Sequence, residues 1–344
     1  MEEKRANKHN HPNWKRKLLY FLLILFLSSL GVGGYFFYEM YTAANKSFTD
    51  LERAGNKSSL RKQEVTIGDD PLSILLVGVE NYSTGGQNGR ADTLIVVTLN
   101  PETDSMTMTT IPRDTMVEIN QVEEYAGTHK INAAYTFGSI SGYGGSKLTV
   151  ETVENLLDIP IDKYIAVDFE GFKDIVDALG GVTIDVKEGF WEKNIYQNNE
   201  RIYFEQGPMH LNGEEALAFV RMRKRDVNVT YPREERQRQF IRAVMDETIS
   251  AGTILKVDKI SDILGENIET NFKPKEIYGL ERTYASASSN QVETLNIEGT
   301  NERVNGLIYF VPNETGLATI SEQLKQQLQL KTNKTMPTIY KANN

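Results

Sequence analysis

The sequence predicts an α/β domain in which a mixed central β-sheet lies between layers of helices, preceded by one N-terminal transmembrane helix. Three observations support this prediction. Apolar runs of strand length alternate with amphipathic helical patterns from residue 67 to residue 330. This region of roughly 260 residues is long enough to form one large domain with its own core. A long uncharged run precedes it, from Leu18 to Tyr38.

The run 18–38 predicts a signal-anchor helix that stays in the membrane. At 1.5 Å per residue, a helix over this run reaches about 31 Å, roughly the thickness of the hydrocarbon core. The basic tail 1–17 precedes it, and basic flanks remain in the cytoplasm. A cleaved signal peptide is the alternative, but Gly33 and Gly34 lead into four aromatic residues rather than a small-residue cleavage site. We therefore expect a single-pass protein of the cell membrane whose body is extracellular.

Composition narrows the class of protein further. The chain has no cysteine, which excludes disulfides, thiolate metal sites and a cysteine nucleophile, and which is typical of exported proteins of Gram-positive bacteria. The whole chain has a net charge of −9, while residues 1–38 carry six basic and two acidic side chains. The remainder is therefore strongly acidic, and nucleic-acid binding is not expected. Any anion must be bound by a local basic cluster.

The remaining elements follow in order along the chain. Residues 39–66 are polar and predict a juxtamembrane stalk, and the polar residues 331–344 predict a disordered tail. Between them, the domain 67–330 shows strand patterns at Ser73–Val79, Thr93–Leu99, Met106–Ile111, Val182–Val186 and Ile202–Phe204. Helical patterns occur at 146–157, 169–179, 213–220, 233–250 and 313–329. For the apolar face of helix 169–179, packing in the core is favoured over a lipid-lining role.

A pair of carboxylates flanks a glycine-rich loop between the first two strands. Glu80 ends one strand, Asp92 begins the next, and Gly85, Gly86 and Gly89 lie between them. Two carboxylates without histidine or cysteine suit a hard cation, Mg²⁺ or Mn²⁺, which takes oxygen ligands and retains positions for substrate phosphates. An ordinary solvent-exposed hairpin is the alternative, and the residues alone leave both open.

Arginines supply the candidate anion site. Arg113 follows a strand and Pro112, which places it at the rim of the sheet, although an ordinary surface salt bridge to Asp114 is the alternative. A denser cluster lies further on, in an extended segment and the first turn of the following helix: Arg221, Arg223, Arg225, Arg233, Arg236 and Gln237. Cations at a helix N-terminus oppose the macrodipole, so the cluster favours a bound anion over a solvated basic face.

These segments together resemble the LytR-CpsA-Psr family of bacterial cell-wall glycopolymer ligases. The resemblance covers residues 67–330, because many independent motifs occur in the same order as in the family. They are the strand ending at Glu80, Arg90–Thr93, Ile111–Thr115, Lys130–Tyr135, Asp168–Phe172, Leu179–Val182, Leu211–Gly213, Arg221–Arg223 and Arg233–Gln237.

The resemblance implies the reaction and the roles of the site residues. Members transfer a glycopolymer, commonly wall teichoic acid, from undecaprenyl diphosphate to the C6 hydroxyl of N-acetylmuramic acid in peptidoglycan, and release undecaprenyl phosphate. The family fold has a hydrophobic pocket for the prenyl chain. Glu80 and Asp92 would hold Mg²⁺, and Asp92 is also the candidate for orienting or deprotonating the hydroxyl. The diphosphate would be bound by Arg113, Arg221, Arg223, Arg233, Arg236 and Gln237.

Two departures from the family pattern and two rival functions remain open. The first acidic position is usually aspartate and is Glu80 here, and the loop Thr230–Arg233 lacks the usual carboxylate and glycine. A membrane-anchored protein that binds or attenuates without turnover would use the same pocket, and a diphosphate hydrolase would use the same site with water as the acceptor. The identity of the glycopolymer also stays open.

Overall fold

A six-stranded mixed sheet forms the centre of the molecule. The computed structural model describes residues 47–250, 267–284 and 292–330. The strand order is β11 (Ile268–Thr270), β6 (Lys163–Asp168), β1 (Leu72–Glu80), β2 (Arg90–Asn100), β3 (Ser105–Thr110) and β12 (Val292–Asn296). The pairs β1–β6 and β3–β12 are parallel, and the other three pairs are antiparallel. The predicted mixed central sheet is confirmed.

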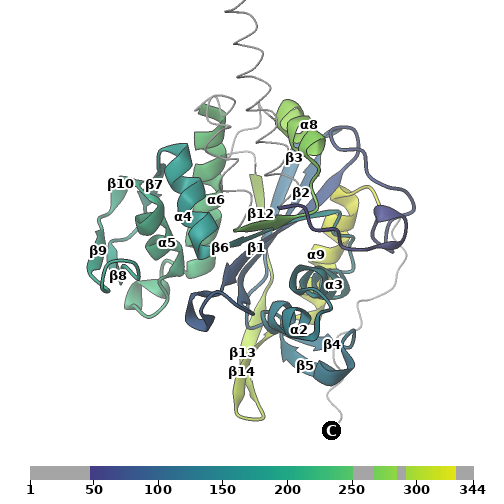
Figure 1. Ribbon diagram of the computed structural model, residues 1–344, viewed down its shortest axis with the longest axis horizontal. Helices are drawn as coiled ribbons and strands as arrows, with labels where there is room; N and C mark the ends of the chain where they lie inside the picture. The colour runs from purple at the N-terminus through teal and green to yellow at the C-terminus, as the bar shows by residue number, and fades with distance from the viewer. Residues whose placement is uncertain (1–46, 251–266, 285–291, 331–344) are drawn as a thin grey trace, which may run out of the picture.

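Helices cover both faces of this sheet (Figure 1). One side carries α2 (Ala133–Ser141), α3 (Gly145–Leu157) and α9 (Glu314–Gln327), and the other carries α4 (Phe169–Leu179), α5 (Gly213–Arg221), α6 (Arg233–Ser250) and α8 (Pro274–Tyr284). The period-two pattern of β1 divides its side chains between these layers. Leu75, Val77 and Val79 join the core beneath α3 and α9, whereas Leu72 and Ile74 face the opposite layer.

Four small two-stranded units and four 3₁₀ turns complete the described part of the chain. The units are β4 (Met116–Ile119) with β5 (Gly127–Lys130), β7 (Val182–Val186) with β10 (Gly207–Leu211), β8 (Phe190–Lys193) with β9 (Arg201–Phe204), and β13 (Gly299–Val304) with β14 (Leu307–Pro312). The turns are η1 (Ala54–Asn56), η2 (Tyr82–Thr84), η3 (Glu123–Tyr125) and η4 (Asp226–Asn228). The units β7–β10 and β8–β9 pack with α4, α5 and α6 around a separate aromatic core that includes Phe190, Phe204, Phe219 and Tyr231.

The predicted strands and helices are confirmed to within a few residues at each end. The elements not predicted from the sequence are the inner strand β6, the helix α8 and several short strands, most of which are partly exposed. The helix α2 is also not predicted, because its sequence AAYTFGSIS contains glycine, serine and threonine, which are weak helix formers. Its formation depends on packing against α3 and β2.

The prediction that residues 39–66 form a stalk is wrong for the described part, residues 47–66. Leu51 is only 2% exposed and belongs to the main core. Arg53 bonds to Glu154 Oε2 at 2.9 Å, and Arg61 bonds to Asp162 Oδ2 at 2.7 Å. These partly buried ion pairs hold the segment against the domain, and their partners lie about 100 residues away in sequence, where a local pattern cannot show them.

The predicted cytoplasmic tail 1–17, membrane anchor 18–38 and C-terminal tail 331–344 lie outside the described residues. Within the described ranges, no helix combines the length and the apolar character needed to cross a membrane.

Candidate active site

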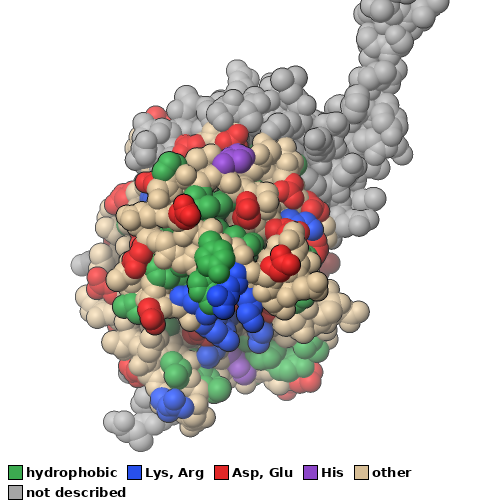
Figure 2. All heavy atoms as spheres, turned by 90° about the vertical axis from the view of Figure 1, so that its left-hand side faces the viewer, with side chains coloured by type: hydrophobic (Ala, Val, Ile, Leu, Met, Phe, Trp, Pro, Cys, Tyr) green, Lys and Arg blue, Asp and Glu red, His purple; other side chains and the backbone are tan. Residues whose placement is uncertain are grey.

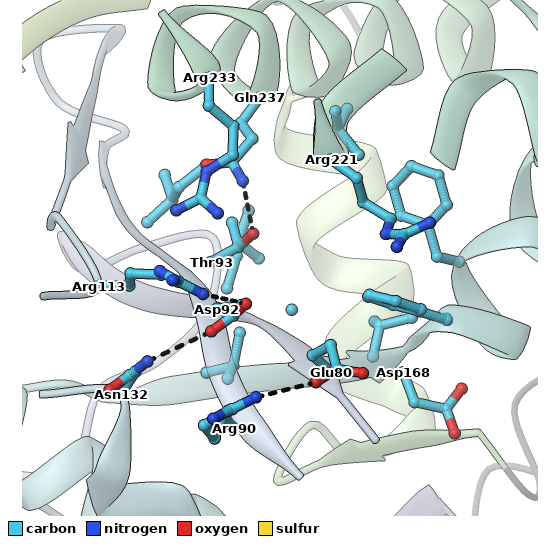
Figure 3. A pocket seen from close by; sticks show the side chains of 18 of the residues that line it. Glu80, Arg90, Asp92, Thr93, Arg113, Asn132, Asp168, Arg221, Arg233 and Gln237 are labelled. Atoms are coloured by element: carbon cyan, nitrogen blue, oxygen red, sulfur yellow. Dashed lines mark hydrogen bonds and ion pairs between the residues drawn. The ribbon is translucent and has the colours of Figure 1, made fainter. Parts of the chain in front are cut away.

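A deep cavity of about 900 Å³ lies between the sheet and the layer of α4 and α6. This volume is near the upper end for ligand sites in proteins. Its interior is apolar and is lined by sheet and helix side chains: Leu76, Ile95, Ile165, Val167, Phe172, Ile175, Phe240, Ile241, Val244 and Met245. Polar and charged side chains gather around one part of the cavity, as Figure 3 shows, and we call this part the mouth. The cavity therefore suits an amphiphilic ligand with a charged head and an apolar tail.

A β-bulge positions the residues at the mouth. Gly78 pairs with Thr93, but Val79 pairs with Ala91, so Asp92 is an extra residue without a partner on β1. Asp92 and Thr93 both line the cavity, although regular alternation would send one of them to the opposite face. Glycine is needed at position 78, because a Cβ there would lie 2.9 Å from the Cβ of Thr93.

Each of the two predicted metal-binding carboxylates is held by neighbouring donors. Glu80 accepts hydrogen bonds from the backbone N–H and hydroxyl of Ser83, at 2.8 and 2.6 Å, and lies 3.5 Å from Arg90 Nη2. Burial by itself raises the pKa of Glu80, but the bonds from Ser83 and the charge of Arg90 outweigh it and leave the pKa below its ordinary value. Asp92 accepts from Arg113 Nη1 at 2.5 Å and from Asn132 Nδ2 at 3.3 Å (Figure 3).

Arg113 and Arg233 approach the mouth from the sheet rim and from α6, respectively. Arg113 contacts Asp92 and also lies 3.6 Å from Asp114 Oδ2. Arg233 is only 9% exposed, and its nearest acidic partner, Glu234, is 3.9 Å away. Burial lowers the pKa of Arg233, and the neighbouring cations Arg113 and Arg223 lower it further. Cations that repel one another in a partly desolvated space favour binding of an anion.

Arg221 and Gln237 complete this arrangement. Arg221 ends α5, where the macrodipole favours a cation, and its guanidinium lies 5.0 Å from the ring centroid of Phe169. Burial lowers the pKa of Arg221, while Glu192 and Glu80 oppose that shift. Gln237 Nε2 donates to Thr93 Oγ1 at 2.8 Å and so connects α6 to the bulge.

The structure brings together all but one of the residues assigned to the cation, the hydroxyl or the diphosphate, and it places Arg225 of the wider arginine cluster over Trp191. Those that line the cavity are Glu80, Asp92, Arg113, Arg221, Arg223, Arg233 and Gln237. The exception is Arg236, whose assignment to diphosphate binding is wrong. Its guanidinium is fully buried and donates to the carbonyls of Phe219, Met222 and Tyr231 and to Asn228 Oδ1. Arg233 and Arg236 are three residues apart on α6, but Arg236 turns into the aromatic core.

Sequence reasoning gave no role to several side chains that line the mouth. Arg90 pairs with Glu80, Asn132 bonds to Asp92, and Lys130 Nζ lies 2.8 Å from Asp114 Oδ1. These residues belong to the Arg90–Thr93 and Lys130–Tyr135 motifs. The motifs therefore mark them in the sequence, but the motifs do not indicate what each side chain does. The apolar face of α4 was assigned to the core, but Phe169, Phe172 and Ile175 line the cavity. Helical periodicity reports burial and does not distinguish a core from a pocket.

Glu80 and Asp92 are chemically suited to a divalent cation. No group of three or more histidine, cysteine, aspartate or glutamate side chains able to hold a metal ion occurs within the described ranges. Mg²⁺, however, is commonly bound through one or two carboxylates together with substrate phosphates and water. Two carboxylates beside a group of arginines therefore fit a divalent cation whose remaining coordination positions are filled by phosphate oxygens of a ligand.

The fold and the site define a class: an α/β domain with a cavity whose charged mouth suits an anionic head group and whose interior suits an apolar chain. The sequence profile of the LytR_cpsA_psr family matches residues 34–326. The chain belongs to this family.

Curated relatives and solved structures agree with this membership. A relative from Bacillus subtilis (strain 168) named polyisoprenyl-teichoic acid--peptidoglycan teichoic acid transferase TagV is 44% identical over 91% of this chain and 80% of its own length. TagU from the same strain is 36% identical over 92% of this chain and 97% of its own. The crystal structure of B. subtilis TagV has a TM-score of 0.66 and covers 77% of this chain and 99% of that one. A structure described as TagT bound to LI-WTA is 31% identical, has a TM-score of 0.66, and covers 82% of this chain and all of that one.

Proposed function

We propose that this protein transfers a glycopolymer, wall teichoic acid in the first instance, from undecaprenyl diphosphate to the C6 hydroxyl of N-acetylmuramic acid in peptidoglycan. The observation that carries the proposal is the amphiphilic cavity, with an apolar interior beside a mouth lined by Arg113, Arg221, Arg223 and Arg233. A polyprenyl diphosphate combines these two chemistries in one molecule. The relatives named TagV and TagU carry this transferase activity in their names.

The chemical step breaks one bond and forms one bond. The muramyl C6 oxygen attacks the phosphorus that bears the glycopolymer and forms the new phosphodiester. The bond from this phosphorus to the bridging oxygen breaks, undecaprenyl phosphate leaves with the electron pair, and the hydroxyl proton passes to a base. Catalysis of this type depends mainly on positioning and on stabilisation of the charge that develops on the phosphoryl oxygens.

The residues at the mouth have distinct roles in this step. The guanidinium groups of Arg221, Arg223 and Arg233 bind the diphosphate oxygens, and the planar fork of each group suits two oxygens at once. Asp92, held between Arg113 and Asn132, orients or deprotonates the attacking hydroxyl. Glu80 and Asp92 would hold Mg²⁺ or Mn²⁺, which would supply Lewis-acid stabilisation of the phosphoryl oxygens.

We also propose that residues 18–38 anchor the protein in the cell membrane, with the N-terminus in the cytoplasm and the domain outside. The support is the basic flank before Leu18 and its absence directly after Tyr38. External protease on intact protoplasts should remove an epitope placed after Asn344 and spare one placed before Glu2. Protection of the C-terminal epitope would contradict this orientation.

Transfer is tested with the full-length protein in detergent, an undecaprenyl diphosphate-linked teichoic precursor and uncrosslinked glycan chains. We expect label from the precursor to appear on the glycan only in the presence of Mg²⁺ or Mn²⁺, and chelation to abolish it. Asp92→Asn should suppress transfer more than Glu80→Gln, because Asp92 also serves the hydroxyl. Release of free glycopolymer phosphate without labelled glycan would indicate a hydrolase. Binding of the precursor without turnover would indicate a non-enzymatic binding protein.

A further inference from the structure

The β8–β9 hairpin has an outer face of aromatic and basic side chains that the proposed chemistry does not use. Trp191 lies opposite Tyr203, and Lys193 lies opposite Arg201, so all four project from the same side of the hairpin. The alternate residues Phe190 and Phe204 are buried in the aromatic core instead. Tyr203 is 60% exposed, and both Lys193 and Arg201 are exposed.

Two guanidinium groups lie over the ring of Trp191, and only one of them has an acidic partner within 4.0 Å among the described residues. The guanidinium of Arg201 lies 4.2 Å from the ring centroid of Trp191, and that of Arg225 lies 3.4 Å from it. Arg225 is also 3.9 Å from Glu192 Oε1, but Lys193 and Arg201 have no acidic partner within 4.0 Å among the described residues. Like charges directly opposite on neighbouring strands destabilise a hairpin, and a bound anion removes that repulsion.

This face is connected to the mouth of the cavity by a short basic segment. Arg221 and Arg223 line the cavity, Met222 between them is completely buried, and Arg225 reaches the hairpin. Figure 2 shows Lys and Arg side chains gathered on the side of the molecule where β8 and β9 lie in Figure 1, with exposed apolar side chains next to them. A ligand chain that leaves the mouth along this segment passes Arg223 and Arg225 before it reaches Trp191, with Glu192 beside Arg225.

We propose that the outer hairpin face, defined by Trp191, Lys193, Arg201, Tyr203 and Arg225, binds the phosphodiester-linked polymer of the donor beyond its diphosphate. The inference rests on the proposed function, since it names a second binding region for the same substrate. Guanidinium groups bind phosphodiester oxygens, and aromatic rings pack against the apolar faces of sugars and polyols. Charge complementarity favours this occupant, because the face is basic although the protein as a whole has a net charge of −9. The tether to the bound diphosphate gives the polymer a high effective concentration at the face.

Tryptophan fluorescence tests binding directly, because the chain has only Trp14 and Trp191. In full-length Trp14→Phe protein, Trp191 is the sole reporter, and soluble poly(glycerol phosphate) without lipid is the probe. We expect a saturable change in emission that weakens with added salt. Lys193→Ala with Arg201→Ala should weaken binding about tenfold, since each exposed charge contact adds a factor of a few. The matched control is Arg303→Ala, which removes an exposed arginine from the β13–β14 hairpin and should leave binding unchanged.

Donor length separates this inference from the proposed function. With wild-type protein as reference, the double variant Lys193→Ala with Arg201→Ala should raise KM for a polymer-bearing donor and leave KM for a donor with a single disaccharide unchanged. The inference would be overturned if wild type and the double variant had equal KM values for the polymer-bearing donor. It would also be overturned if Trp191 emission responded to uncharged glycan strands and not to the charged polymer. Absence of transfer from both donors with wild-type protein would instead refute the proposed function, whatever the fluorescence result.

Discussion

Two arginines three residues apart on α6 should respond to truncation in opposite ways. Arg236→Ala removes a buried guanidinium that donates to three carbonyls and to Asn228. Each unpaired carbonyl costs about 1–3 kcal/mol, while the loss of a buried charge, whose pKa burial lowers to about 10, offsets part of that cost. A net loss of about 3 kcal/mol follows. For a domain of this size, that loss lowers Tm by roughly 6–10 °C.

Arg233→Ala should leave the fold intact and abolish function. Its neighbours Arg113 and Arg223 repel it, and its nearest carboxylate, Glu234, is 3.9 Å away, so its removal costs little stability. We expect Tm to remain within about 2 °C of wild type, equivalent to a change under about 1 kcal/mol. Transfer should fall by about 10²–10³-fold, as is found when one donor to a developing charge is removed.

Two measurements on both full-length variants in the same detergent test whether Arg236 is structural and Arg233 binds substrate. They are Tm from circular dichroism melting and the transfer rate per folded molecule. The reasoning is refuted if Arg236→Ala melts like wild type and loses transfer, because Arg236 would then bind substrate. It is equally refuted if Arg233→Ala loses 6 °C or more and retains its rate, because Arg233 would then be a structural residue.

Three other predictions test the mouth. Arg221→Lys should retain the fold and lose most transfer, because a point charge cannot replace a bidentate fork, and a normal rate with a normal Tm would contradict this. Gly78→Ala should cost about 1–3 kcal/mol in the free energy of unfolding by urea, because its Cβ would meet that of Thr93 at 2.9 Å, and unchanged stability would show that the bulge yields freely. Burial raises the pKa of Asp114, but Lys130 and Arg113 hold it below its ordinary 3.8. Its stabilising effect is present above pH 3.8 and lost as the pH falls through the folded-state pKa. The Tm difference between wild type and Asp114→Asn should therefore be constant from pH 5 to 7 and vanish in stronger acid. A Tm difference that grows as the pH falls would contradict a stabilising role for ionised Asp114.

The sequence predicts the strands β1, β2 and β3 and most of the cavity-lining charges because these features are local, but it does not predict β6, which also lies inside the sheet. Glu80 and Asp92 flank one glycine-rich loop, and the apolar runs of β1 and β2 directly precede and follow it. The bulge at Asp92 is not local, since it depends on how β2 registers against β1. For that reason, alternation alone could not show that Asp92 and Thr93 both face the cavity.

The arginine cluster shows the same limit at the level of single side chains. Arg233 and Arg236 carry the same charge in the same helical turn, and no property of that turn tells which one faces the cavity. The difference comes from residues 219–231, whose carbonyls converge on Arg236 after α5 and the following loop fold back. The segment 47–66 was misjudged for a related reason, because Arg53 and Arg61 find their acidic partners only in the folded domain.

Acidic and basic side chains at the mouth pair with one another in the absence of substrate. Asp92 is paired with Arg113, and Glu80 accepts hydrogen bonds from Ser83 and lies near Arg90, so each carboxylate has a cationic neighbour. In the proposed transfer, Glu80 and Asp92 would hold a divalent cation. Arg90 and Arg113 would then be free to pair with phosphate oxygens. Such an exchange would let one mouth bind an anion without leaving its carboxylates unpaired.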